Sequence, residues 1–106
     1  MLRMIKVKLV DHKDKKSLGL HENDWTTFSK CCDLIEQVFN GAIENKERLP
    51  TPAALADVYI TYHLQSGTVD INLDEAWGID IFCSSDDLLF KLQKAMASSH
   101  VFTVST

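Results

Sequence analysis

The stretch VYITYHLQSGTVDINLDEAWGIDIFC, residues 58–83, decides the fold. Apolar and polar residues alternate along it in three runs, and a period of two is typical of strands that are buried on one face only. Ser66-Gly67 lies between the first two runs and predicts a two-residue hairpin turn. We therefore expect three antiparallel strands. Their inward side chains are Val58, Ile60, Tyr62 and Leu64, then Val69, Ile71 and Leu73, then Trp77, Ile79, Ile81 and Cys83.

Two amphipathic helices flank these strands in the sequence. The first begins near Asn23 or Asp24, because either side chain can cap a first helical turn, and it ends at Gly41. The second follows Ser84, which forms a capping box with Asp87. Their apolar stripes comprise Trp25, Phe28, Cys31, Cys32, Leu34, Ile35, Val38, Phe39 and Ala42 in the first helix, and Leu88, Leu89, Leu92, Ala95 and Met96 in the second.

The two ends of the chain supply further strands, at Arg3–Val10 and Val101–Val104. Asp11–Lys16 and Glu44–Arg48 are expected to be charged connections, and Thr51–Leu55 one helical turn with Pro52 at its start. We predict that residues 1–106 form one α+β domain. Its architecture is a two-layer sandwich, a mainly antiparallel sheet with two helices on one face, in the order β-α-β-β-β-α-β.

Composition limits the class of protein. The 106 residues are 45% hydrophobic and 25% charged, which is ordinary for a globular protein. No apolar run is long enough for a membrane span, and no targeting segment is recognised at the N-terminus. The three cysteines, Cys31, Cys32 and Cys83, have no disulfide-framework or CxxC spacing. That spacing favours a reducing compartment, so the expected location is cytoplasmic, and no metal or cofactor is expected.

Charge is distributed unevenly along the chain. The formal net charge of -4 argues against a protein that binds nucleic acid directly by neutralising phosphates. Residues 1–16 contain six basic and two acidic residues, whereas residues 49–90 contain no Lys or Arg. The acidic residues of that second segment are Asp57, Asp70, Asp74, Glu75, Asp80, Asp86 and Asp87.

The expected hairpin places part of this acidity on the open face of the sheet. A turn at Ser66-Gly67 pairs His63 with Asp70, Thr61 with Asn72 and Tyr59 with Asp74. A three-residue loop to the next strand then pairs Asp70 with Asp80. Two carboxylates directly opposite each other destabilise a sheet unless they are compensated. His63, the Lys6 and Lys8 face of the first strand, a cation or a basic partner protein are the candidates for this compensation.

The candidate partner-binding residues are the polar and aromatic side chains of this face. Aromatic side chains such as Tyr59 and Phe82, exposed among acids, are typical anchors of protein interfaces. The competing interpretations are solvated charges with internal partners, and a divalent-metal site formed by His63, Asp70 and Asp80. The full set is Tyr59, His63, Asp70, Asn72, Asp74, Glu75, Asp80 and Phe82.

Catalysis has one candidate nucleophile. Cys83 precedes a helix N-terminus, where the pKa of a thiol can fall, and His63 or His100 could serve as its base. Asp86 and Asp87 would raise that pKa, and strand parity turns Cys83 inward. No Walker, GxGxxG or HExxH pattern is present. We therefore expect no catalytic residue and no enzymatic activity.

The favoured hypothesis is a non-catalytic module that binds a basic protein partner, as a monomer or weak homodimer. In size, charge and lack of catalytic motifs, the chain resembles the small immunity proteins of bacterial nuclease toxins. A nuclease must be basic where it holds phosphates, so an acidic domain can be steered onto it and inhibit it. The alternatives are a structural or adaptor subunit that associates through a sheet edge or through Tyr59 and Phe82, and a small Cys- or metal-dependent enzyme.

Overall fold

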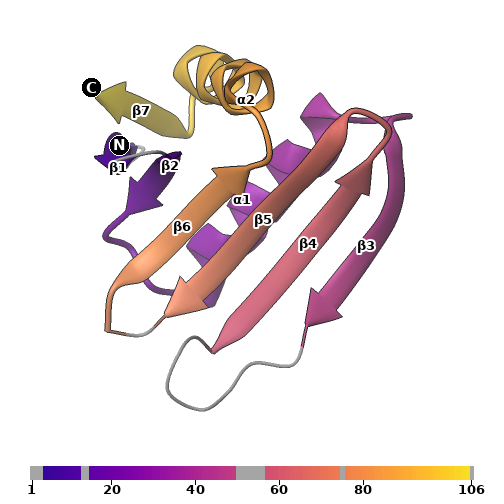
Figure 1. Ribbon diagram of the computed structural model, residues 1–106. Helices are drawn as coiled ribbons and strands as arrows, with labels where there is room; N and C mark the ends of the chain where they lie inside the picture. Colours follow the sequence, from indigo (N-terminus) through magenta and orange to yellow (C-terminus); the bar gives the residue numbers. More distant parts are fainter. Residues whose placement is uncertain (1–3, 13–14, 50–56, 75, 106) are drawn as a thin grey trace.

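The computed structural model describes residues 4–12, 15–49, 57–74 and 76–105. These residues form a seven-stranded sheet in the order β3-β4-β5-β6-β2-β1-β7, with two helices (Figure 1). Neighbouring strands are antiparallel except β1 and β7, which are parallel. The elements are β1 (Ile5–His12), β2 (Lys15–Leu20), α1 (Trp25–Val38), β3 (Ile43–Leu49), β4 (Val58–Leu64), β5 (Gly67–Asp74), β6 (Gly78–Cys83), α2 (Asp86–Ser98) and β7 (Phe102–Ser105).

Both helices contribute to the same hydrophobic core. Figure 1 shows α1 behind β5 and β6, and α2 at the upper end of β6 beside β7. The second helix contacts β7, β6, β2 and α1. Leu18, Ile81 and Ile71 are paired across β2, β6 and β5 and are fully buried, so they define the covered face of the sheet. Ile35 of α1 and Leu92 of α2 complete this core. The predicted α+β fold is confirmed, with its expected elements in the expected order.

Two further strands extend the sheet where charged connections were expected. Of the expected connection Asp11–Lys16, Asp11 and His12 lie in β1, and Lys15 and Lys16 lie in β2. The second strand continues to Leu20, with Leu18 and Leu20 buried. The lysines and Gly19 obscured this short alternation in the sequence. Glu44–Arg48 lies within β3, an edge strand whose polar side chains are exposed. Charged residues are usual on an edge strand, because they discourage pairing with other chains.

The register between β4 and β5 differs from the prediction by two residues. Leu64 pairs with Gly67, so Gln65-Ser66 forms the turn, and Asp70 lies opposite Thr61 instead of His63. A slip of two residues keeps every side chain on its predicted face. The cause lies outside the hairpin, because Ser84 occupies the space beside Gly67. The Thr68 backbone N–H donates to Ser84 Oγ at 2.9 Å, and Ser84 N–H donates to the Thr68 carbonyl at 2.9 Å.

The helix caps are partly as predicted. The Asp24 carboxylate accepts from Thr27 N–H at 2.8 Å and caps α1, as expected. The cap of α2 is Ser85, whose hydroxyl accepts from Leu88 N–H, and not Ser84, which is bonded to Thr68. The turn expected at Thr51–Leu55 lies outside the described residues.

Both tryptophans were wrongly expected to be buried. Trp25 is the first residue of α1, so it lies at the margin of the apolar stripe, edge-on to Phe28. Trp77 lies in the turn before β6, and this strand begins at Gly78. Strand parity therefore does not apply to Trp77, and its side chain is 79% exposed.

Gly78 holds β6 against the end of β2. It has a φ of 101°, and a Cβ on it would overlap the carbonyl oxygen of Leu20. Gly41 has a similar φ of 85°, but a Cβ there would meet nothing within 4 Å. The two glycines therefore separate the effect of backbone conformation from that of close approach.

We predict that Gly78→Ala lowers the free energy of unfolding by more than Gly41→Ala does. Gly41→Ala should cost on the order of 1 kcal/mol from the positive φ alone. Gly78→Ala adds a steric overlap with the backbone and should cost about 2 kcal/mol more. Urea unfolding followed by circular dichroism measures both, and equal costs would contradict the close approach of β6 to Leu20.

Candidate functional site

The open face of the sheet carries the candidate site. In the part of the chain that the structure describes, both helices pack on the opposite face. Strand pairing aligns the open-face residues in rows that cross the sheet. One row contains Glu47, Thr61, Asp70, Phe82, Ser17 and Val10, and the next contains Leu49, Tyr59, Asn72, Asp80, Gly19 and Lys8.

Asp70 is compensated by neighbouring hydroxyl groups. Thr61 Oγ1 donates to Asp70 Oδ1 at 2.7 Å, and the Tyr59 hydroxyl also bonds to Asp70. Burial raises the pKa of Tyr59, and the adjacent Asp70 carboxylate raises it further. Asp70 is therefore part of an internal network with Thr61 and Tyr59.

The predicted His63–Asp70–Asp80 row is not formed. Asp70 lies opposite Phe82, Asp80 lies opposite Asn72, and His63 lies opposite Thr68. This register keeps carboxylates on adjacent strands from facing each other directly. Within the described ranges, no three His, Cys, Asp or Glu side chains are placed to share a metal ion.

The other predicted site residues have partners of their own. His63 Nε2 is 3.2 Å from Glu47 Oε1 on β3, a strand that the sequence prediction missed. Asp74 Oδ1 accepts from Ala76 N–H at 2.8 Å and so supports the turn before β6. Glu75 lies outside the described residues. Phe82 has Lys15 Nζ 5.4 Å from its ring centroid, a cation–π distance.

Lys6, Lys8 and Lys15 share the open face with the acids. Lys8 lies in the same row as Asp80, with only Gly19 between them. Lys6 has the same strand parity as Lys8, and both are exposed. The face is therefore divided: acidic residues lie on β3 to β6, and lysines lie on β1 and β2.

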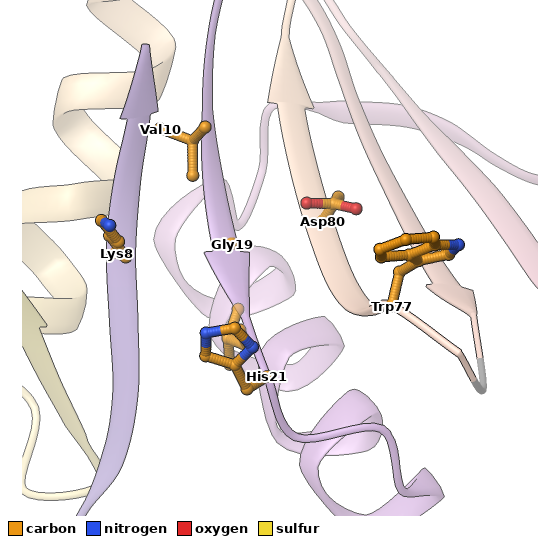
Figure 2. Close-up of a pocket in the computed structure, with 7 residues that line it drawn as sticks. Lys8, Val10, Gly19, His21, Trp77 and Asp80 are labelled. Carbon is orange, nitrogen blue, oxygen red and sulfur yellow. The ribbon is translucent and has the colours of Figure 1, made fainter.

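A hollow lies at the boundary between these two halves (Figure 2). Its volume is about 220 Å³, and Gly19 leaves room for it because a side chain there would enter the space between Val10 and Asp80. Figure 2 shows Lys8 and Val10 on one side of Gly19, Asp80 and Trp77 on the other, and His21 below. The lining residues are Lys8, Val10, Gly19, Leu20, His21, Trp77 and Asp80.

Sequence reasoning identified only Asp80 of this hollow as a site residue. The other lining residues were missed because β2 was not predicted and because Trp77 was assigned to the core. Gly78 did contain a usable signal, because an isolated glycine inside a strand pattern suggests a bulge or a close approach of the backbone.

Comparisons with protein-family models, with curated proteins and with solved structures found no match to this chain. The open-face side chains are therefore the basis for a functional proposal. Neither described helix is long and apolar enough to cross a membrane.

The surroundings of the three cysteines disfavour the reactive thiolate form. All three are free and buried. Burial raises the pKa of Cys83 to about 12, and the Asp70 carboxylate adds to this shift. Burial also raises the pKa of Cys31 to about 12. A thiol with such a pKa has almost no thiolate at neutral pH, and the thiolate is the nucleophilic form.

A polar network on the covered face joins α1 to β3 and β4. The buried Tyr62 hydroxyl donates to Glu36 Oε2 at 2.7 Å, and Lys46 Nζ donates to the same oxygen at 3.0 Å. These two bonds lower the pKa of Glu36, the Tyr62 hydroxyl having the larger effect. The network positions the helix on the sheet and takes no part in the open face.

We predict slow alkylation of Cys83 in the native protein. With a pKa of about 12, about one thiol in ten thousand is ionised at pH 8. Iodoacetamide at pH 8 should label added glutathione within minutes, and it should label the chain unfolded in urea equally fast. Native Cys83 should be labelled far more slowly. Mass spectrometry of the labelled peptides measures this, and rapid native labelling would reopen the nucleophile hypothesis.

The Glu36 network predicts a pH dependence of stability. The folded state lowers the pKa of Glu36, so its carboxylate contributes to the free energy of unfolding at neutral pH. This contribution is lost as the pH falls through the pKa of Glu36 in the folded state. In Glu36→Gln, the free energy of unfolding should therefore fall less than in wild type as the pH is lowered into the acid range. Asp33→Asn, on the same helix and outside the network, is the control. An equal fall in Glu36→Gln and wild type would disprove the linkage.

Proposed function

We propose that the chain is a non-catalytic protein-binding module that docks a basic protein partner on the acidic half of its open sheet face. The observation that carries the proposal is the placement of Glu47, Asp70, Asp74 and Asp80 on one side of the face, beside Tyr59 and Phe82. Aromatic side chains provide contact area, and carboxylates provide complementarity to a basic surface.

The most concrete form of this function is an inhibitor or immunity-type protein for a nuclease toxin. A nuclease holds phosphates with basic side chains, and an acidic surface can reach it by electrostatic steering and then exclude nucleic acid. The lysines of β1 and β2 sharpen the proposal, because they repel a basic partner from the other half of the face. Such a divided surface favours one orientation of the partner over others.

The proposed form in solution is a monomer in the cytoplasm. The exposed charges of β3 disfavour pairing through that edge, and the other edge strand, β7, has only four residues. Three free thiols suit a reducing compartment. The proposal assigns no catalytic role to Cys83, because its burial and raised pKa disfavour the thiolate.

The test measures association of the chain with basic nuclease domains, beginning with any encoded beside its gene. We predict that the combined variant Asp70→Asn, Asp74→Asn and Asp80→Asn slows association by about tenfold at low salt and flattens its salt dependence. Asparagine keeps the shape of each side chain and one acceptor oxygen, which can still accept from Thr61 Oγ1 and Ala76 N–H, so the fold should be retained. Stopped-flow or surface plasmon resonance measures the rates, and circular dichroism checks the fold.

The matched control is the combined variant Asp11→Asn, Asp33→Asn and Asp87→Asn. It makes the same change in net charge at exposed positions away from the open face. This control should keep the wild-type association rate to within about twofold. Equal slowing by both variants would show that net charge alone matters, and an unchanged rate for the open-face variant would refute the acidic docking surface.

A further inference from the structure

The hollow over Gly19 has the size of a site for one side chain. Sites for whole drug-sized ligands usually measure about 300 to 1,000 Å³. This hollow measures about 220 Å³ and is shallow, because its floor is the backbone of β2 at Gly19. Its position at the boundary of the acidic half places it within the surface proposed to meet a partner.

Two of its walls suit a positively charged group. Trp77 is 79% exposed, and its ring is drawn beside Asp80 at the rim of the hollow. Indole is the ring that attracts a cation most strongly, and a carboxylate next to it adds an ion pair. Arginine fits both walls, because its guanidinium is planar, stacks on aromatic rings and bonds to a carboxylate through two N–H groups.

We propose that this hollow receives an arginine side chain of the partner, stacked on Trp77 and bonded to Asp80. The inference rests on the proposed function, because it names the group that a basic partner inserts. Val10 supplies an apolar wall for the methylene stem of the arginine. The absence of a side chain at Gly19 is what admits the guanidinium to the level of Asp80.

Lys8 makes the proposal specific. It stands on the wall opposite Asp80, and its positive charge opposes an arginine there. Removal of this charge must therefore strengthen the binding of a cation. For an anionic or zwitterionic occupant, Lys8 would be a ligand, and its removal would weaken binding. Lys8→Gln thus separates the two chemistries by the sign of its effect.

The experiment is an NMR titration of the ¹⁵N-labelled chain with N-acetyl-arginine amide at constant ionic strength. The signals followed are the Gly19 amide and the Trp77 indole N–H. N-acetyl-citrulline amide is the neutral control of the same shape, and N-acetyl-glutamate amide is the anionic control. The variants are Asp80→Asn, Lys8→Gln, Gly19→Val and Trp77→Ala, and Trp77→Ala keeps the test valid if Gly19→Val does not fold, because Trp77 is outside the core.

The arginine probe should shift both signals saturably, and citrulline and glutamate probes should not. Asp80→Asn should weaken its binding about twofold to fivefold, the range of an exposed ion pair, and Lys8→Gln should strengthen it by a similar factor. Gly19→Val should abolish the shift at Trp77, and in Trp77→Ala the Gly19 shift should be lost. Equal binding of citrulline, binding of glutamate, or weaker binding in Lys8→Gln would overturn the arginine site.

The outcome is distinguishable from failure of the proposed function, because this titration uses no partner protein. If the acidic-face variant slows association but the arginine probe leaves Gly19 and Trp77 unshifted, only the side-chain site is wrong. If no basic nuclease domain binds in an Asp-dependent manner, the docking function itself is wrong.

Discussion

The pairing of β2 with β6 is the interaction on which the rest of the structure depends. It joins an N-terminal hairpin to strands about 60 residues further along the chain, and the pairs Ser17–Phe82 and Gly19–Asp80 set its register. Such a distant contact requires a large loop to close, at an entropic cost that packing must recover. Leu18 and Ile81 meet on the covered face and are fully buried, so the same pairing also completes the core.

This junction also creates the divided charge of the open face. The basic residues are local to the start of the sequence and the acidic ones to its second half. Without β2 beside β6, the two groups would belong to separate surfaces. With it, Lys8 and Asp80 stand two strands apart, a backbone separation of about 10 Å, with Gly19 between them. The geometry of the site is therefore a consequence of one long-range register.

Much of the fold could be predicted because local periodicity is strong in residues 58–83. Their alternation identified the buried face of β4, β5 and β6, and a register slip of two residues left that face unchanged. The register itself was not predictable from the hairpin, since Ser84 fixes it by bonding to Thr68 from beyond β6. Strands β2 and β3 were missed because short, lysine-rich or edge segments have little apolar alternation.

The candidate site was less predictable than the fold because it depends on which rows align. The sequence correctly placed Asp70, Asp80 and Phe82 on the open face but aligned the wrong partners, and it gave no indication that Gly19 would lie beside Asp80. A larger residue at position 19 would bring its side chain between Val10 and Asp80 and remove the hollow.

A glycine in the interior of a strand usually weakens it and often marks a close approach of another group. An added Cβ at position 19 would meet Val10 at 3.3 Å and Asp80 at 3.5 Å, so even alanine would require Val10 to move by a few tenths of an ångström. Glycine at position 19 therefore keeps open the space that the proposed arginine would enter.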